Sequence, residues 1–193
     1  MEPLPTTASE LAAREKWIRA AGWAILLLSA GSALLPLLEP AHGATVIGVL
    51  LVLAGLIEMF AGSLRHETRR LAMIAGIITT LAGTLFALQN ATHFLSTLSI
   101  VAGWLFARSV VLMLATRLER GSVRLWTGIA ALTDLVLALI LAVGLSIATL
   151  VVSLFGATPY MIASFAWVLA ASFIATAMLL LEVASSARDA EDV

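Results

Sequence analysis

The chain has 193 residues, of which 61% are hydrophobic and only 12% are charged. A soluble domain is about half apolar and about a quarter charged, so this composition indicates a protein whose surface mostly faces lipid. The net charge of −1 excludes the basic surface typical of nucleic-acid binding, and the lack of cysteine excludes disulfides, thiolate metal sites and cysteine nucleophiles.

Residues 1–16 form a polar N-terminal segment that is predicted to hold a short helix on the membrane surface. Thr7 and Glu10 have the spacing of a capping box, which marks the start of a helix. This helix runs into the first membrane span. The apolar stretch from Gly22 to Leu38 is longer than the core of a signal peptide, so the first span is expected to remain uncleaved.

Six stretches are long and apolar enough to cross a bilayer, which takes about 20 residues in a helix. The predicted spans cover residues 17–38, 43–64, 70–88, 93–116, 124–147 and 160–182. Residues 148–158 are apolar and rich in β-branched side chains, and they either extend the fifth span or form a re-entrant loop. The prediction is an all-α polytopic membrane protein, with a six-helix transmembrane domain over residues 17–183 and an acidic tail over residues 184–193.

Ten of the eleven Lys and Arg residues flank the spans on one side of the membrane. They are Arg14, Lys16, Arg19, Arg65, Arg69, Arg70, Arg117, Arg120, Arg124 and Arg188. Because connections rich in Lys and Arg stay in the cytoplasm, both termini are predicted to be cytoplasmic. We interpret these ten cations as explained by topology, without a further functional message.

The spans form three helical hairpin repeats of parallel orientation. The odd spans each begin with a basic residue that is followed by a glycine, and spans 2 and 4 share a register of small residues. The pairs in the odd spans are Lys16 and Gly22, Arg70 and Gly76, and Arg124 and Gly128. Gly76 and Gly83 also belong to ladders of small residues on span 3, which predict close helix packing within the bundle or between protomers.

With Trp17 and Trp126 near the start of their spans and three hairpins within 193 residues, the chain resembles the HdeD-like family of acid-resistance membrane proteins. The resemblance covers residues 14–183. It implies a six-helix protein of the bacterial inner membrane that is linked to acid stress, and it brings no catalytic motif.

Glu58, Arg108 and Asp134 are the strongest candidates for a site because they are ionisable residues inside the predicted spans. At about 1.5 Å per residue, they lie about 10, 13 and 15 Å from the flanking arginines on the cytoplasmic side. Charges at membrane depth usually find partners, and the similar depths make a buried cluster of the three geometrically possible. This cluster is either an ion lock, meaning buried ion pairs that fix the order of the helices, or a proton or ion pathway. In a third alternative, Arg108 and Glu58 only reach the membrane interface.

A second candidate is a pH-sensing outer face formed by Glu39, His42 and His93. Histidine becomes charged as the pH falls through about 6.5, which suits a role linked to acid. The alternative is that these histidines are solvated loop residues. A metal site is not expected because the donors come from separate hairpins without close ligand spacing, and no cofactor is predicted.

The sequence lacks a nucleophile elbow, a P-loop, a zinc-protease motif and a dinucleotide fingerprint, so an enzyme is not expected. The predicted function is that of a non-enzymatic, stress-related protein of the bacterial inner membrane. It would act through helix–helix contacts with itself, as a homo-oligomer, or with other membrane proteins. Two alternatives are a small channel or proton or ion transporter that uses Glu58, Arg108 and Asp134, and an accessory subunit of a larger membrane complex.

Overall fold

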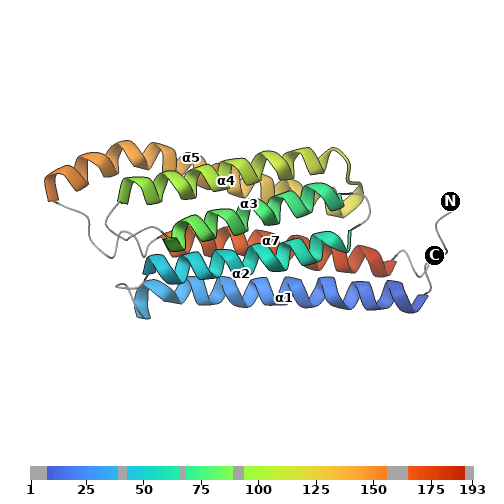
Figure 1. Cartoon of the computed structure of the whole chain (residues 1–193). Coiled ribbons are helices and arrows are strands. Elements are labelled where there is room, and N and C mark those ends of the chain that lie inside the picture. The colour runs from blue at the N-terminus through green and yellow to red at the C-terminus, as the bar shows by residue number, and fades with distance from the viewer. Residues whose placement is uncertain (1–7, 39–42, 66–67, 89–93, 156–164, 190–193) are drawn as a thin grey trace.

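The computed structural model describes residues 8–38, 43–65, 68–88, 94–155 and 165–189, and these ranges consist of helices and short connections without strands. The helices are α1 (Ala8–Leu38), α2 (Gly43–Ser63), α3 (Arg69–Leu88), α4 (Phe94–Thr116), α5 (Gly121–Phe155) and α7 (Phe165–Asp189). Each of the six is long and apolar enough to cross a membrane. The predicted fold class, a six-helix all-α membrane protein, is thereby confirmed (Figure 1).

Two helices, α5 and α7, extend beyond the predicted spans, and α1 joins the two helical parts predicted for the N-terminus. α1 is one continuous helix from Ala8, so the predicted surface helix and the first span form a single element. α5 continues to Phe155, which makes residues 148–155 an extension of the fifth span, and residues 156–158 lie outside the described ranges. α7 continues to Asp189, and Ala184, where the acidic tail was predicted to begin, is fully buried in the bundle.

The helices form a closed bundle in which each packs against its neighbours in the chain and α1 packs against α7. The most extensive contacts are α2 with α3, α1 with α7, and α4 with α5. The hairpins of the sequence repeat, α1–α2, α3–α4 and α5–α7, pack less extensively. The tightest pairs therefore cross the boundaries between the repeats.

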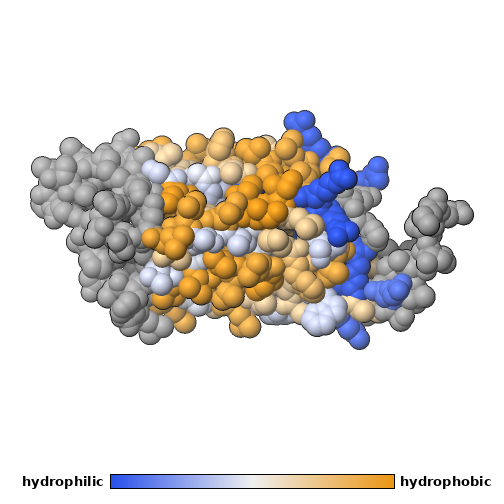
Figure 2. Space-filling view, in the orientation of Figure 1, coloured by the Kyte–Doolittle hydropathy of each residue, from blue (hydrophilic) through white to orange (hydrophobic). Residues whose placement is uncertain are grey.

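The start of α1, the end of α7 and the connections α2–α3 and α4–α5 lie at one end of the bundle (Figure 1). Figure 2 shows hydrophilic residues gathered at this end and hydrophobic residues along the remaining visible length of the bundle. We call it the basic end, because its arginines are those that flank the spans in the sequence.

Glycines bring α2 and α3 into backbone contact. A Cβ atom on Gly55 would lie 2.6 Å from the backbone nitrogen of Thr80, and one on Gly83 would lie 2.6 Å from the backbone nitrogen of Val52. A Cβ on Gly76 would be equally crowded, at 2.7 Å from the backbone nitrogen of Met59. The small residues of span 3 thus serve packing within the bundle, where they let two helices approach closely.

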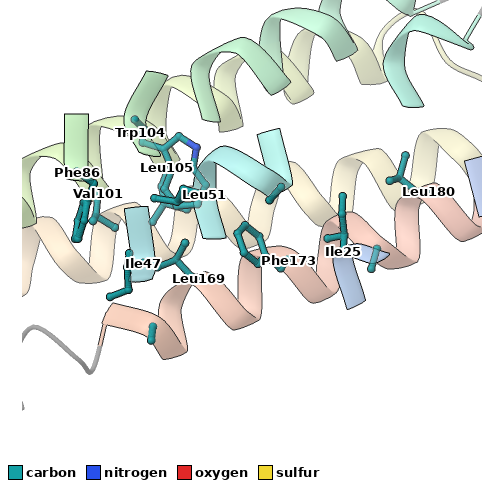
Figure 3. Close-up of a cluster of buried hydrophobic side chains, with 14 of the residues drawn as sticks. Ile25, Ile47, Leu51, Phe86, Val101, Trp104, Leu105, Leu169, Phe173 and Leu180 are labelled. Carbon is teal, nitrogen blue, oxygen red and sulfur yellow. The ribbon is translucent and has the colours of Figure 1, made fainter. Parts of the chain in front are cut away.

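Large apolar side chains fill the interior and also cover the outside. Figure 3 shows part of the buried cluster, to which all six described helices contribute, α5 through Ala138 and Leu141. On the outer surface, Leu27, Leu88 and Val143 are 73%, 77% and 68% exposed. Soluble monomers rarely expose apolar patches on this scale, so the outer surface is suited to lipid.

Candidate functional site

The three ionisable residues predicted inside the spans are buried in the bundle. Glu58 on α2, Arg108 on α4 and Asp134 on α5 are only 7%, 2% and 0% exposed. Ala131 and Ala138 lie about one turn before and after Asp134 on the same face of α5, and both are buried. Such small residues let neighbouring helices come close enough for short polar side chains to meet.

Arg108 joins the two acids. Its Nη2 atom donates a hydrogen bond of 2.9 Å to Oε1 of Glu58, and its Nη1 atom donates to Oδ2 of Asp134. The structure therefore brings together the three residues that the sequence placed at similar depth. One guanidinium group with two donor arms holds α2, α4 and α5 in a defined order.

Two hydroxyl groups on α7 complete the coordination of Arg108. Nη2 donates to Oγ1 of Thr176 at 2.6 Å, and Nη1 donates to Oγ of Ser172 at 3.2 Å. The Ser172 hydroxyl in turn donates to Oδ1 of Asp134 at 2.6 Å. The Thr176 hydroxyl donates to the backbone carbonyl of Ser172, which leaves its oxygen free to accept from Arg108. Both α7 residues were missed by the sequence reasoning.

Helix α3 reaches the cluster through Thr79. Nε1 of Trp104 donates to the Thr79 hydroxyl oxygen at 3.1 Å. The single hydrogen of this hydroxyl can go to the carbonyl of Ala75, at 3.0 Å, or to Oε2 of Glu58, at 3.4 Å. The polar network thus draws on α2, α3, α4, α5 and α7, and it ties together five of the six described helices.

The cluster holds more negative than positive charge when all its groups are ionised, because two carboxylates share one guanidinium. Removing ions from water costs several kcal/mol each, and close pairing with further hydrogen bonds offsets that cost. Asp134 accepts from Arg108 and Ser172, and Glu58 accepts from Arg108. Among the described residues, Nε of Arg108 is buried without a hydrogen-bond partner.

A second buried ion pair lies at the basic end and was not anticipated. Glu119, in the connection between α4 and α5, is 6% exposed and accepts from Nη1 of Arg65 at 3.4 Å. It also accepts from the hydroxyls of Thr68, at 2.9 Å, and Thr127. Burial lowers the pKa of Arg65, and the negative charges of Glu119 and Glu58 act against this shift. Arg65 therefore takes part in a buried ion pair in addition to flanking a span.

The two charge clusters adjoin one cavity. Glu58 and Arg65 both line it, together with Thr176 and apolar residues, and it offers about 10 Å³ to the centre of a water molecule. That is about the minimum for one bound water. Nε of Arg65 is buried and lacks a hydrogen-bond partner in the described part of the chain.

The other predicted sites are not placed by the structure. Glu39, His42 and His93 lie outside the described residues, so the pH-sensing outer face stays a prediction. Among the described residues, no group of three His, Asp or Glu side chains could hold a metal ion.

No protein-family model, curated protein or solved structure matches this chain. The fold and the site define its class: it is a multi-pass helical membrane protein with a buried charge cluster at the centre of the bundle.

Proposed function

We propose that this chain is a non-enzymatic protein of the bacterial inner membrane, with both termini in the cytoplasm, that acts through helix contacts with a second copy or with other membrane proteins. The charge cluster serves as an ion lock that keeps the bundle rigid. The resemblance to the HdeD-like family supports a link to acid stress, and the basic end supports the orientation.

One observation carries the proposal of helix contacts. The glycines of α2 and α3 are enclosed by each other's helices, whereas Gly31 on α1 and Gly103 on α4 are exposed. A Cβ atom at either position would meet no described atom within 4 Å. Exposed glycines on membrane helices are places where a partner helix can approach closely.

The test replaces Gly31 or Gly103 with leucine, which fills the surface without disturbing the bundle. We expect the wild-type protein to migrate as a complex after gentle solubilisation of native membranes, and at least one of these variants to migrate as a monomer. Val136→Leu is the control, because Val136 is an exposed apolar residue on α5 and should leave the complex unchanged. Native mass analysis of the complex separates a homo-oligomer from an accessory subunit in a larger assembly.

The control for folding is the free energy of unfolding, which neither glycine substitution should lower. Survival of a deletion strain at low pH then tests the stress link, with rescue expected from wild type and not from the variant that loses the complex. A wild-type protein that is monomeric, or variants that retain the complex, would contradict the proposal.

A second candidate function is a proton or ion pathway, and the cavity between Glu58 and Arg65 favours it. A water in this cavity would connect the excess negative charge of the cluster with the basic end. The test is proton flux into liposomes that contain the purified protein. A pathway requires proton flux through the wild-type protein that Glu58→Gln and Asp134→Asn abolish. An ion lock predicts no proton flux through the wild-type protein.

A further inference from the structure

The connection between α4 and α5 presents an unbalanced charge to its surroundings. Arg117, in this connection, and Arg124, in the first turn of α5, are exposed. The acid among them, Glu119, is turned into the bundle, where it pairs with Arg65. Burial of this one carboxylate leaves the outer side of the connection positively charged, which suits an anionic partner at the level of the membrane interface.

An open groove begins at this connection and continues along α5. It has a volume of about 510 Å³, and Arg124 lies in its wall near Gly121, the first residue of α5. Farther along α5 the wall is apolar, and Leu125 and Leu132 are 63% and 56% exposed. The groove is therefore charged at the basic end and apolar beyond it.

Gly128 deepens the middle of the groove. A Cβ atom on this residue would meet only Cγ2 of Thr116, at 3.8 Å, among the described atoms. The stretch from Gly121 to Leu132 rises about 16 Å along the helix at 1.5 Å per residue. This length matches a large part of one acyl chain that enters a leaflet from the interface.

We propose that this groove binds a phospholipid with an anionic headgroup. The headgroup phosphate accepts hydrogen bonds from the Arg124 guanidinium, and one acyl chain lies along Gly128 and the exposed leucines of α5. Arginine forms strong, charge-assisted hydrogen bonds with phosphate oxygens. A free phosphate would leave the apolar part of the groove unused. A zwitterionic lipid would gain less from the positive connection.

The test is native mass spectrometry of the full-length, delipidated protein with added phosphatidylglycerol or phosphatidylcholine of the same acyl chains. We expect one phosphatidylglycerol to be retained in preference to phosphatidylcholine. Arg124→Gln should weaken retention of phosphatidylglycerol roughly fivefold, because one cation is removed from an anionic contact, and should weaken retention of phosphatidylcholine less, because its choline group offsets the phosphate charge. Gly128→Leu should weaken retention of both lipids because it fills the acyl-chain part of the groove.

Arg70→Gln is the matched control, because Arg70 is an exposed arginine of the basic end at the start of α3. It should leave retention of phosphatidylglycerol unchanged. An equal loss of phosphatidylglycerol retention in Arg70→Gln and Arg124→Gln would show that the lipid is attracted to the basic end as a whole. That result would overturn the proposed lipid site in the groove. Equal retention of the two lipids by the wild-type protein would overturn it as well. A circular dichroism spectrum confirms that each variant is folded.

Discussion

Replacing Arg108 perturbs the centre of the charge cluster and shows how much it stabilises the bundle. Arg108→Ala removes hydrogen bonds to Glu58, Asp134, Ser172 and Thr176 at once. It also leaves two carboxyl groups buried without a counter-charge. Loss of one partner from a buried ion pair costs about 3–5 kcal/mol, and we expect a loss of this size in the free energy of unfolding.

Arg108→Lys keeps the positive charge and loses the two-armed geometry. Because an ammonium group is a compact point charge, it cannot reproduce the separate bonds of Nη1 and Nη2 to Asp134 and Glu58. Losing one charged hydrogen bond costs about 1.5–3 kcal/mol, so this variant should lie between wild type and Arg108→Ala. A triple variant, Glu58→Gln with Arg108→Met and Asp134→Asn, holds no charge in the cluster and should recover much of the stability lost in Arg108→Ala.

The assay is unfolding of the purified variants by sodium dodecyl sulfate in mixed micelles at neutral pH, followed by far-ultraviolet circular dichroism. The expected order of stability places wild type above Arg108→Lys and Arg108→Lys above Arg108→Ala. Equal stability of the two single variants, or an Arg108→Ala value within about 0.5 kcal/mol of wild type, the usual range for uninvolved surface sites, would refute the ion lock.

Three further predictions concern the α2–α3 contact, the buried ion pair at the basic end and the hydroxyl group of Thr79. Gly55→Leu should destabilise the bundle strongly in the same unfolding assay, because a Cβ there would lie 2.6 Å from a backbone nitrogen of α3. Gly103→Ala, which has open space around it, should instead raise the free energy of unfolding by about 1 kcal/mol. Equal effects of the two substitutions would refute the α2–α3 packing. Glu119→Ala should increase deuterium uptake in the connections α2–α3 and α4–α5, because it removes their shared acceptor, and unchanged uptake would show that the buried pair does not hold them. Thr79→Val leaves Nε1 of Trp104 without its acceptor and should cost about 1–3 kcal/mol, so unaltered stability would exclude Thr79 from the network.

The fold and the three central charges were predictable because each rests on a simple physical rule. The length of the apolar stretches gives the number of spans. The rise of a helix per residue converts the number of residues between a buried charge and the flanking arginine into a depth in the membrane. Glu58, Arg108 and Asp134 emerged at similar depth on different spans, and because buried charges usually find partners, a cluster of the three was geometrically possible. The structure shows that they form this cluster.

The hydroxyl partners were not predictable from the same rules. Ser172 and Thr176 are small polar residues in an apolar helix, and such hydroxyls often bond to their own helix backbone, as Thr176 also does. Their spacing of four residues puts them on one face of α7, which was the only available signal.

Glu119 and Arg65 show a different limit of sequence reasoning. Both lie in connections between spans, where a charged residue is expected to be solvated. Tertiary packing instead buries them as an ion pair, in which Glu119 also accepts from Thr68 and Thr127. The sequence repeat likewise marked similar hairpins without indicating that α1 closes the bundle against α7.

Proton flux into liposomes, measured with a pH-sensitive dye for wild type and Asp134→Asn side by side, tests most directly whether the cluster is a lock. An ion lock predicts no flux above that of protein-free liposomes for either protein, while an added protonophore collapses the gradient in every sample. Flux through the wild-type protein that Asp134→Asn abolishes would contradict it.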